Sequence, residues 1–182
     1  MRRARRRRVA RGTLAGIAGG LAASWVMNLF MSKLGVKLTE SLMSDEDKRQ
    51  QRLQQQSRQE QGPEEDATMK AAEGIVHTVT RGQHLSHEER KQAGPVVHYA
   101  FGALAGGIYG ALAECTDWTS VGFGTVFGAL LYASADLIGV PAFGLAPSAT
   151  QQPAAAQATP LAAHLVYGAT TDLVRRAIRA AA

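Results

Sequence analysis

Hydrophobic and polar positions are sorted into long blocks along this chain. Residues 12–32 and 137–171 carry no charge, whereas charged residues and glutamines are dense over residues 37–95. Between Glu114 and Asp172 only two residues, Asp117 and Asp136, are charged. A bilayer core about 30 Å thick needs roughly 20 apolar helical residues. The uncharged blocks therefore predict membrane-spanning helices, and a soluble helical bundle with a polar insert is the alternative.

Four stretches are suited to crossing a bilayer: residues 13–32, 96–113, 120–140 and 160–173. The second follows Gly94-Pro95, where proline suits a first helical turn, and the third ends near Pro141. The fourth is short and ends in polar residues. All four are rich in glycine and alanine. We expect an all-α fold, a polytopic membrane bundle of four Gly/Ala-rich helices with an amphipathic helical excursion between the first and the second.

This pattern divides the chain into four regions: a basic tail (1–12), a first transmembrane helix (13–36), a polar exported segment (37–94), and three further transmembrane helices with a basic end (95–182). Within the polar segment, Ser44 resembles a helix N-cap followed by acids. Gly62-Pro63 predicts a break before a second helix over residues 64–78. Ser86 and Glu89 have the spacing of a capping box.

Charge predicts how the spans are oriented. Seven arginines fall within the first eleven residues, and Arg175, Arg176 and Arg179 follow the fourth span. The positive-inside rule places both ends in the cytoplasm, which requires an even number of spans. A cleaved signal peptide is an alternative for the N-terminus. The arginines could also bind nucleic acid, but no interleaved aromatic residues support that reading, and we favour contact with the anionic lipid bilayer.

Known catalytic and cofactor motifs are missing from the sequence. Cys115 is the one cysteine, so neither a disulfide nor a cysteine metal cluster can form within the chain. The glycines lie inside predicted helices and do not form a phosphate-binding loop. We therefore expect no enzyme activity, no cofactor and no resident metal.

Small residues recur every fourth position within the predicted spans. Residues four apart share one face of a helix, and small residues there let helix backbones approach closely in lipid. These seams should face one another and could also support a homo-oligomer or a membrane complex. They contain Gly16, Gly20, Gly102, Gly106, Gly110, Gly124, Gly128 and Gly168.

Ionisable residues stand at the ends of these seams, where an unpaired charge in hydrocarbon is costly. Heights counted from the turn between the second and third spans place His98, Asp136 and His164 at one depth near the outer leaflet. A second group, expected to form ion pairs at the cytoplasmic face, contains Glu114, Asp172, Arg175 and Arg176. Either cluster could simply bond helices together. The outer one could instead carry protons or small solutes, or ligate haem or metal through its histidines.

Three motifs carry a resemblance to a known family: residues 98–114 (HYAFGALAGGIYGALAE), 141–147 (PAFGLAP) and 164–176 (HLVYGATTDLVRR). Together with residues 12–25 they are similar to the YagU-type family of bacterial inner-membrane proteins, whose function is unknown. The resemblance implies a multi-pass inner-membrane protein and no particular reaction. Asp136 stands where some relatives are expected to have histidine, which argues against a fixed haem or metal role. We expect a structural or accessory membrane protein, with proton or small-solute transport through His98, Asp136 and His164 as the alternative.

Overall fold

The first helix is longer than the predicted span. In the computed structural model, which describes residues 2–60, 65–148 and 153–181, helix α1 (Arg2–Phe30) passes through a π-helical segment, η1 (Met31–Gly35), into α2 (Val36–Leu42). The backbone stays right-handed helical at both junctions. These 41 residues form a rod of about 60 Å at 1.5 Å per residue. The basic tail is thus helical from Arg2, and the predicted boundary at residue 36 falls inside the rod.

The polar segment forms two helices whose starts follow from their caps. Helix α3 (Asp45–Glu60) begins where the Ser44 hydroxyl accepts a hydrogen bond from the Asp47 amide at 3.1 Å, as the sequence predicted. Helix α4 (Ala67–Thr80) begins later than expected, because Asp66 is its N-cap and accepts from the Met69 amide at 2.8 Å. The predicted break at Gly62-Pro63 lies outside the described residues.

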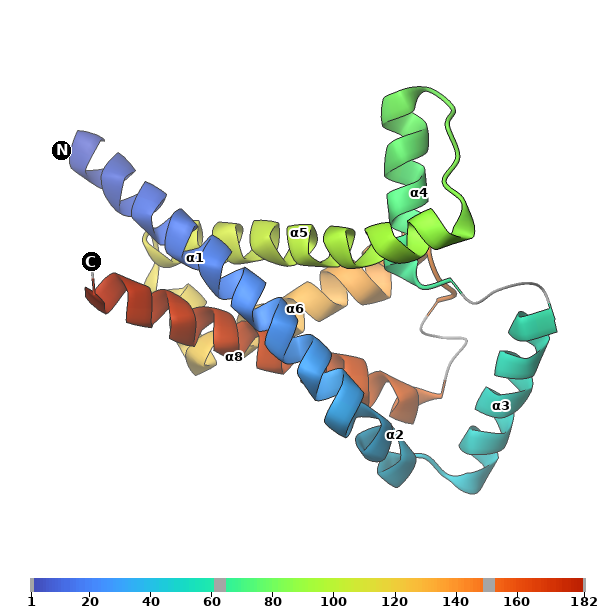
Figure 1. Ribbon diagram of the computed structural model, residues 1–182. Coiled ribbons are helices and arrows are strands. Elements are labelled where there is room, and N and C mark those ends of the chain that lie inside the picture. Colours follow the sequence, from blue (N-terminus) through green and yellow to red (C-terminus); the bar gives the residue numbers. More distant parts are fainter. Residues whose placement is uncertain (1, 61–64, 149–152, 182) are drawn as a thin grey trace.

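Only the first half of the apolar face of α4 is buried. Met69 and Ala72 are buried, and Met69 lies against Gly94 of the following helix. Farther along the same helix, Ile75 and Val79 are 53 % and 76 % exposed. The C-terminal half of α4 projects away from the other helices (Figure 1).

Helix α5 (His87–Ala113) runs through the proline that was expected to open the second span. Its start is the predicted capping box: the Ser86 hydroxyl accepts from the Glu89 amide, and the Glu89 carboxylate accepts from the Ser86 amide. The expected helix start at Pro95 is therefore wrong, because the helix begins at His87 and continues through the proline. Pro95 removes one backbone hydrogen bond, which does not stop a helix whose first turn is already fixed by its cap.

The third span begins with an irregular segment. Within η2 (Asp117–Gly124), assigned as 3-10 helix, the backbone leaves the helical region at Val121, and three successive residues, Gly122, Phe123 and Gly124, have positive φ. Regular α-helix, α6 (Thr125–Leu131), starts only after them, although the apolar run as a whole, Thr119–Ala142, agrees with the predicted start of the span at Ser120. The span continues as a π-helix, η3 (Tyr132–Gly139), and ends as predicted beside Pro141 in α7 (Val140–Ala142).

The last helix also extends beyond its predicted bounds. A 3-10 turn, η5 (Ala154–Gln157), leads into α8 (Ala158–Ala181), so the arginines that follow the predicted fourth span belong to the same helix. The described residues contain helices and no strand, which confirms the all-α prediction.

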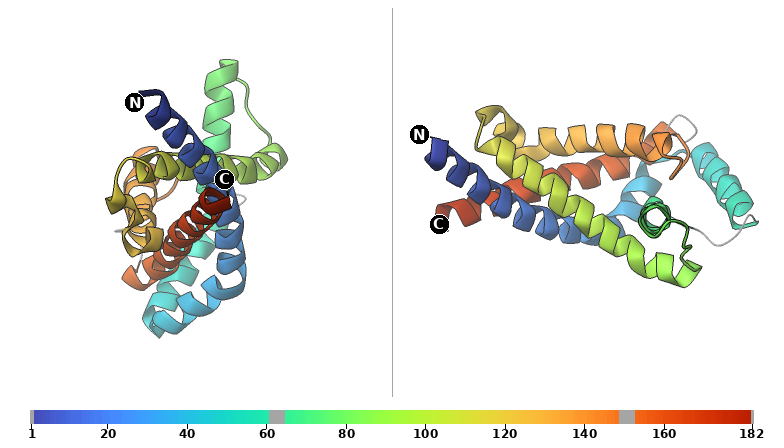
Figure 2. Two further views of the ribbon diagram at one scale, coloured as in Figure 1. Left: turned by 90° about the vertical axis from the view of Figure 1, so that its left-hand side faces the viewer. Right: turned by 90° about the horizontal axis from the view of Figure 1, so that it is seen from above.

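Within the described residues, the runs α1 with α2, α5, α6 with η3, and α8 each extend between the same two ends of the molecule (Figures 1 and 2). Both termini and the η2 turn lie at one end, which we call the termini end. The other end, which we call the excursion end, carries α2, α3 and α4 (Figure 1).

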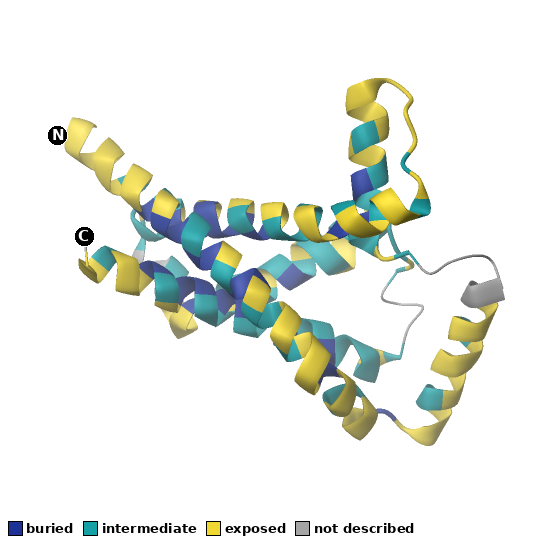
Figure 3. Cartoon of the chain, in the orientation of Figure 1, coloured by how far each residue is buried: buried dark blue, intermediate teal, exposed yellow. Residues whose placement is uncertain are grey.

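The distribution of side chains is inverted relative to a soluble bundle. The residues that face other helices are mostly glycine, alanine and tyrosine, with polar residues such as Ser24, Thr171 and Asp172 among those buried. Large apolar side chains such as Leu14, Trp25 and Leu104 point outward and are 67 %, 61 % and 62 % exposed. Figure 3 shows the buried positions along the lines where helices meet.

Among the described residues, three helical runs are long and apolar enough to cross a membrane: Arg2–Leu42, His87–Ala113 and Thr119–Ala142. Helix α8 is not among them, so this measure supports three of the four predicted spans. On α8 the polar residues Thr171, Asp172 and Arg175 are buried and Leu173 is exposed, so these three polar side chains face the other helices.

Candidate functional site

The glycine seams meet in two pairs within the chain. Along α1 and α5, Gly16 lies against Gly106 and Gly110, and Gly20 lies against Gly102. A methyl group added at any of these positions would come closer than 3.0 Å to backbone or side-chain atoms of the facing helix. The backbones therefore touch, as small residues in lipid permit. Within one chain these glycines already contact each other, and the homo-oligomer stays a prediction.

The second pair joins α6 and α8. Gly124 and Gly168 face each other, and Gly128 lies against the carbonyl of His164. Gly124 is also required by its backbone, because its φ of 83° favours glycine. A further contact that the spacing of four did not reveal places Gly19 of α1 against the carbonyl of Thr171 on α8.

The termini end holds a network of ion pairs. Asp172, 1 % exposed, accepts from Arg175 at 3.0 Å and from Arg176 at 2.6 Å. Arg175 also lies 3.8 Å from the Glu114 carboxylate. The four residues expected to form ion pairs here are therefore linked, because Arg175 contacts both acids and Arg176 contacts Asp172. They tie the end of α5 to α8.

Two arginines that the sequence did not assign complete this network. Arg179 donates to both oxygens of the Glu114 carboxylate, at 2.8 and 3.2 Å, and Arg8 of α1 lies 3.5 Å from it. The hydrogen bond from Arg179 lowers the pKa of Glu114 below its usual value. A spacing of seven from Asp172 to Arg179 could have indicated this, because it places both on one helix face.

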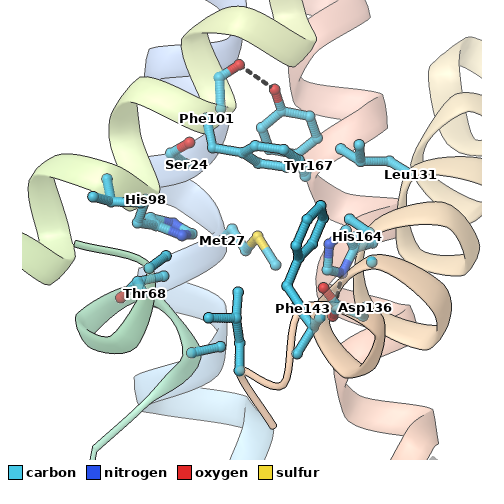
Figure 4. Close-up of a pocket in the computed structure, with 18 residues that line it drawn as sticks. Ser24, Met27, Thr68, His98, Phe101, Leu131, Asp136, Phe143, His164 and Tyr167 are labelled. Atoms are coloured by element: carbon cyan, nitrogen blue, oxygen red, sulfur yellow. Dashed lines mark hydrogen bonds and ion pairs between the residues drawn. The ribbon is translucent and has the colours of Figure 1, made fainter. Parts of the chain in front are cut away.

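At the excursion end, the helices line a partly open cavity of about 370 Å³ (Figure 4). All three residues of the expected outer cluster line it: His98 from α5, Asp136 from η3 and His164 from α8. The rest of the lining is mainly apolar and includes Met27, Phe101, Leu131 and Phe143.

Asp136 and His164 form a pair. Their carboxylate and Nδ1 atoms are 3.7 Å apart. The same Nδ1 lies 2.9 Å from the carbonyl oxygen of Pro160, one turn earlier on α8. A carbonyl oxygen can only accept a hydrogen bond, so Nδ1 of His164 carries a proton and donates a hydrogen bond to the carbonyl of Pro160. Asp136 lies in the π-helix η3, and such segments are frequent at functional sites.

His98 lies across the cavity from this pair, with Met27 between them (Figure 4). Its Nε2 atom is buried, as is the hydroxyl of Ser24 on α1, and neither has a hydrogen-bond partner within the part of the chain that is described. Both residues line the cavity. The structure thus joins two of the three predicted residues directly and places the third on the facing wall.

Several contributors to the cavity were not predicted from the sequence. Tyr167 closes its inner end by donating to the carbonyl of Gly102 at 2.5 Å. It lies one turn after His164 on the same face of α8, a spacing that could have identified it. Ala67, Thr68 and Ala71 of α4 also line the cavity, and no pattern in α4 indicated that it reaches this site.

Comparison with known proteins gives one match. Residues 52–173 match a family described as a protein of unknown function (DUF1440). The matched range includes the cavity residues of α4, α5, η3 and α8, and it begins after α1. No curated protein matches the chain, and no solved structure matches it either.

Proposed function

The chain belongs to the DUF1440 family of proteins of unknown function, and we propose that it is a multi-pass integral membrane protein with a structural or accessory role. In this proposal α1, α5, the α6–η3 run and α8 cross the bilayer. The YagU-type resemblance extends the proposal to the inner (plasma) membrane of a bacterium.

The inverted distribution of side chains carries this proposal. Outward-facing Leu14, Trp25 and Leu104 present apolar surface, while glycines and polar groups occupy the contacts between helices. Monomeric soluble proteins rarely expose apolar patches of this extent. In lipid the same surface is satisfied, and close-packed glycine seams are a common way for helices to associate.

The proposed fourth span is α8, although its sequence is the least apolar. Its buried Asp172 is paired with Arg175 and Arg176, so the helix does not present that charge to lipid. Four crossings agree with the position of both termini at one end (Figure 1). The arginines concentrated at that end favour the cytoplasm under the positive-inside rule.

Membrane insertion is tested by alkaline carbonate extraction and flotation of membranes from cells that express the chain. We expect it to remain in the floated, carbonate-resistant fraction. Recovery of folded, monodisperse protein in the supernatant without detergent would refute the proposal.

Orientation is tested by cysteine labelling. Cys115 is exposed at the termini end, so a membrane-impermeant maleimide should label it in inverted vesicles and not in intact spheroplasts. The matched control is Ser57→Cys in a Cys115→Ser background, which moves the one thiol to exposed α3. This variant should label in spheroplasts only. Labelling of both sites from the same side would contradict four crossings.

Transport of protons or small solutes is the second candidate, because His98, Asp136 and His164 line one cavity. The cavity lining contains no residue of the ion-pair network, and Tyr167 bonds to Gly102 at its inner end. This geometry favours a protein that binds a small molecule in the cavity over one that conducts it across the bundle. Flux in reconstituted vesicles that disappears in Asp136→Asn would reverse that preference.

A further inference from the structure

We propose that the cavity at the excursion end binds a small organic cation, an ammonium group attached to a compact apolar body. The ammonium would lie at the carboxylate of Asp136, and the apolar body against Met27, Phe101 and Phe143. The inference rests on the proposed membrane insertion, because surrounding lipid makes a carboxylate costly when its histidine partner directs its proton to another acceptor.

The charge of the cavity favours a cation. Among the described residues, His164 alone forms an ion pair with the Asp136 carboxylate, through its Nδ1 atom at 3.7 Å. The N–H group at that nitrogen already donates a hydrogen bond to the carbonyl oxygen of Pro160, at 2.9 Å. The carboxylate, whose side chain is 37 % exposed, therefore faces the cavity without a direct hydrogen-bond donor among the described residues, although charges that are partly removed from water are normally paired. An ammonium ion supplies both the opposite charge and the donors, whereas an anion would be repelled.

The walls of the cavity suit the rest of such a molecule. The aromatic rings of Phe101, Phe143 and Tyr167 line it, and aromatic faces attract organic cations. Its volume of about 370 Å³ is near the lower end of the range of about 300–1,000 Å³ for ligand sites, which selects a small molecule. On the facing wall, the unpartnered Nε2 of His98 and hydroxyl of Ser24 are available to a polar substituent of the ligand.

The test compares three probes of the same shape on the full chain purified in detergent: benzylammonium, benzyl alcohol and benzoate. Binding is measured by isothermal titration calorimetry at neutral pH. We expect benzylammonium to bind at least tenfold more tightly than benzyl alcohol, and benzoate more weakly still. Equal affinity for the ammonium and the alcohol, or no binding of any probe, would overturn the proposal.

Variants assign the effect to Asp136. Asp136→Asn should lower affinity for benzylammonium at least tenfold and leave that for benzyl alcohol unchanged, which also reports that the cavity is intact. Glu46→Gln is the matched control, since it removes an exposed carboxylate on α3 and should change nothing. Ala71→Phe, which fills the cavity from α4 without altering charge, should abolish binding of both probes. Unchanged affinity for the ammonium in Asp136→Asn or Ala71→Phe would refute the site.

A lipid headgroup could supply the same ammonium chemistry. Competition with dihexanoyl phosphatidylethanolamine separates the sources: displacement of benzylammonium supports a headgroup site, and lack of displacement supports a free amine. The preparation is first checked by flotation of its source membranes. Failure to float rejects membrane insertion, whereas protein that floats but binds no amine rejects only the cation site.

Discussion

Replacement of Gly106 by alanine is the sharpest test of the glycine seam. A methyl group there would lie 2.7 Å from Cα and 2.9 Å from the nitrogen of Gly20. Carbon atoms in contact are normally about 3.5–4.0 Å apart. Helices α1 and α5 must therefore separate by roughly 1 Å, given that spacing, and the facing atoms are backbone that cannot rotate away.

The expected cost follows from two opposing terms. Overpacking a close contact costs about 1–3 kcal/mol, and alanine in place of glycine returns about 1 kcal/mol through helix propensity. Moving α1 away from α5 also loosens the neighbouring contacts of Gly16 and Gly102, which lowers the free energy of unfolding further. We expect Gly106→Ala to lower the free energy of unfolding by about 2 kcal/mol, roughly a 30-fold change in the equilibrium constant.

The control is Gly74→Ala on α4, where an added methyl group meets no atom within 4 Å. This variant should be neutral or stabilised by up to about 1 kcal/mol. Both free energies are measured by reversible unfolding in mixed micelles, followed by circular dichroism. If Gly106→Ala is as stable as the wild type while Gly74→Ala behaves as expected, the backbone contact between α1 and α5 is not as described.

Three further changes probe the polar contacts. Arg175→Leu leaves buried Asp172 with Arg176 alone and should cost about 3 kcal/mol, part of which Asp172→Asn in the same chain should recover in unfolding experiments. The pKa of Glu114 is lowered in the fold, chiefly by Arg179; its contribution to stability is therefore full above the usual pKa of 4.5 and lost as the pH falls through the lowered value. Stability measured from neutral to acid pH should decline less in Glu114→Gln. Tyr167→Phe removes the hydrogen bond to Gly102 and should cost about 1 kcal/mol; unchanged unfolding would show that this bond does not contribute.

Local signals in the sequence predicted the features that depend on local chemistry. The caps at Ser44 and Ser86 involve side chains and amides three residues apart, and both are present. The spacing of four placed Gly16 and Gly106 on helix faces, and their contact followed because small residues pack closely in lipid. Counting residues along the predicted helices also placed Asp136 and His164 at the same depth, and in the structure their side chains lie 3.7 Å apart.

Features that depend on the whole bundle could not be read in this way. Phe123 has a φ of 54°, a conformation that a bulky residue rarely adopts, so nothing in its identity predicted that α6 would start late. Pro95 is the usual sign of a helix start, yet the cap at Ser86 overrides it. The participation of Ala71 in the cavity depends on where α4 crosses α5, which is a tertiary contact.

The cavity follows physically from the seams themselves. Between the ion-pair network and the cavity each seam consists of glycine, and the helices touch. Toward the excursion end the same lines continue with larger polar residues, so the backbones must move apart. α1 and α5 diverge in this direction (Figure 1). The residues that replace glycine there are Ser24 on α1, His98 on α5, Tyr132 and Asp136 on η3, and His164 on α8. A bundle that is closed at one end by backbone contact and ion pairs must then open at the other, and the groups that hold it open are the ones available to a ligand. Enlarging a closed seam position should therefore destabilise the fold, whereas changing Asp136 should alter binding while the fold persists.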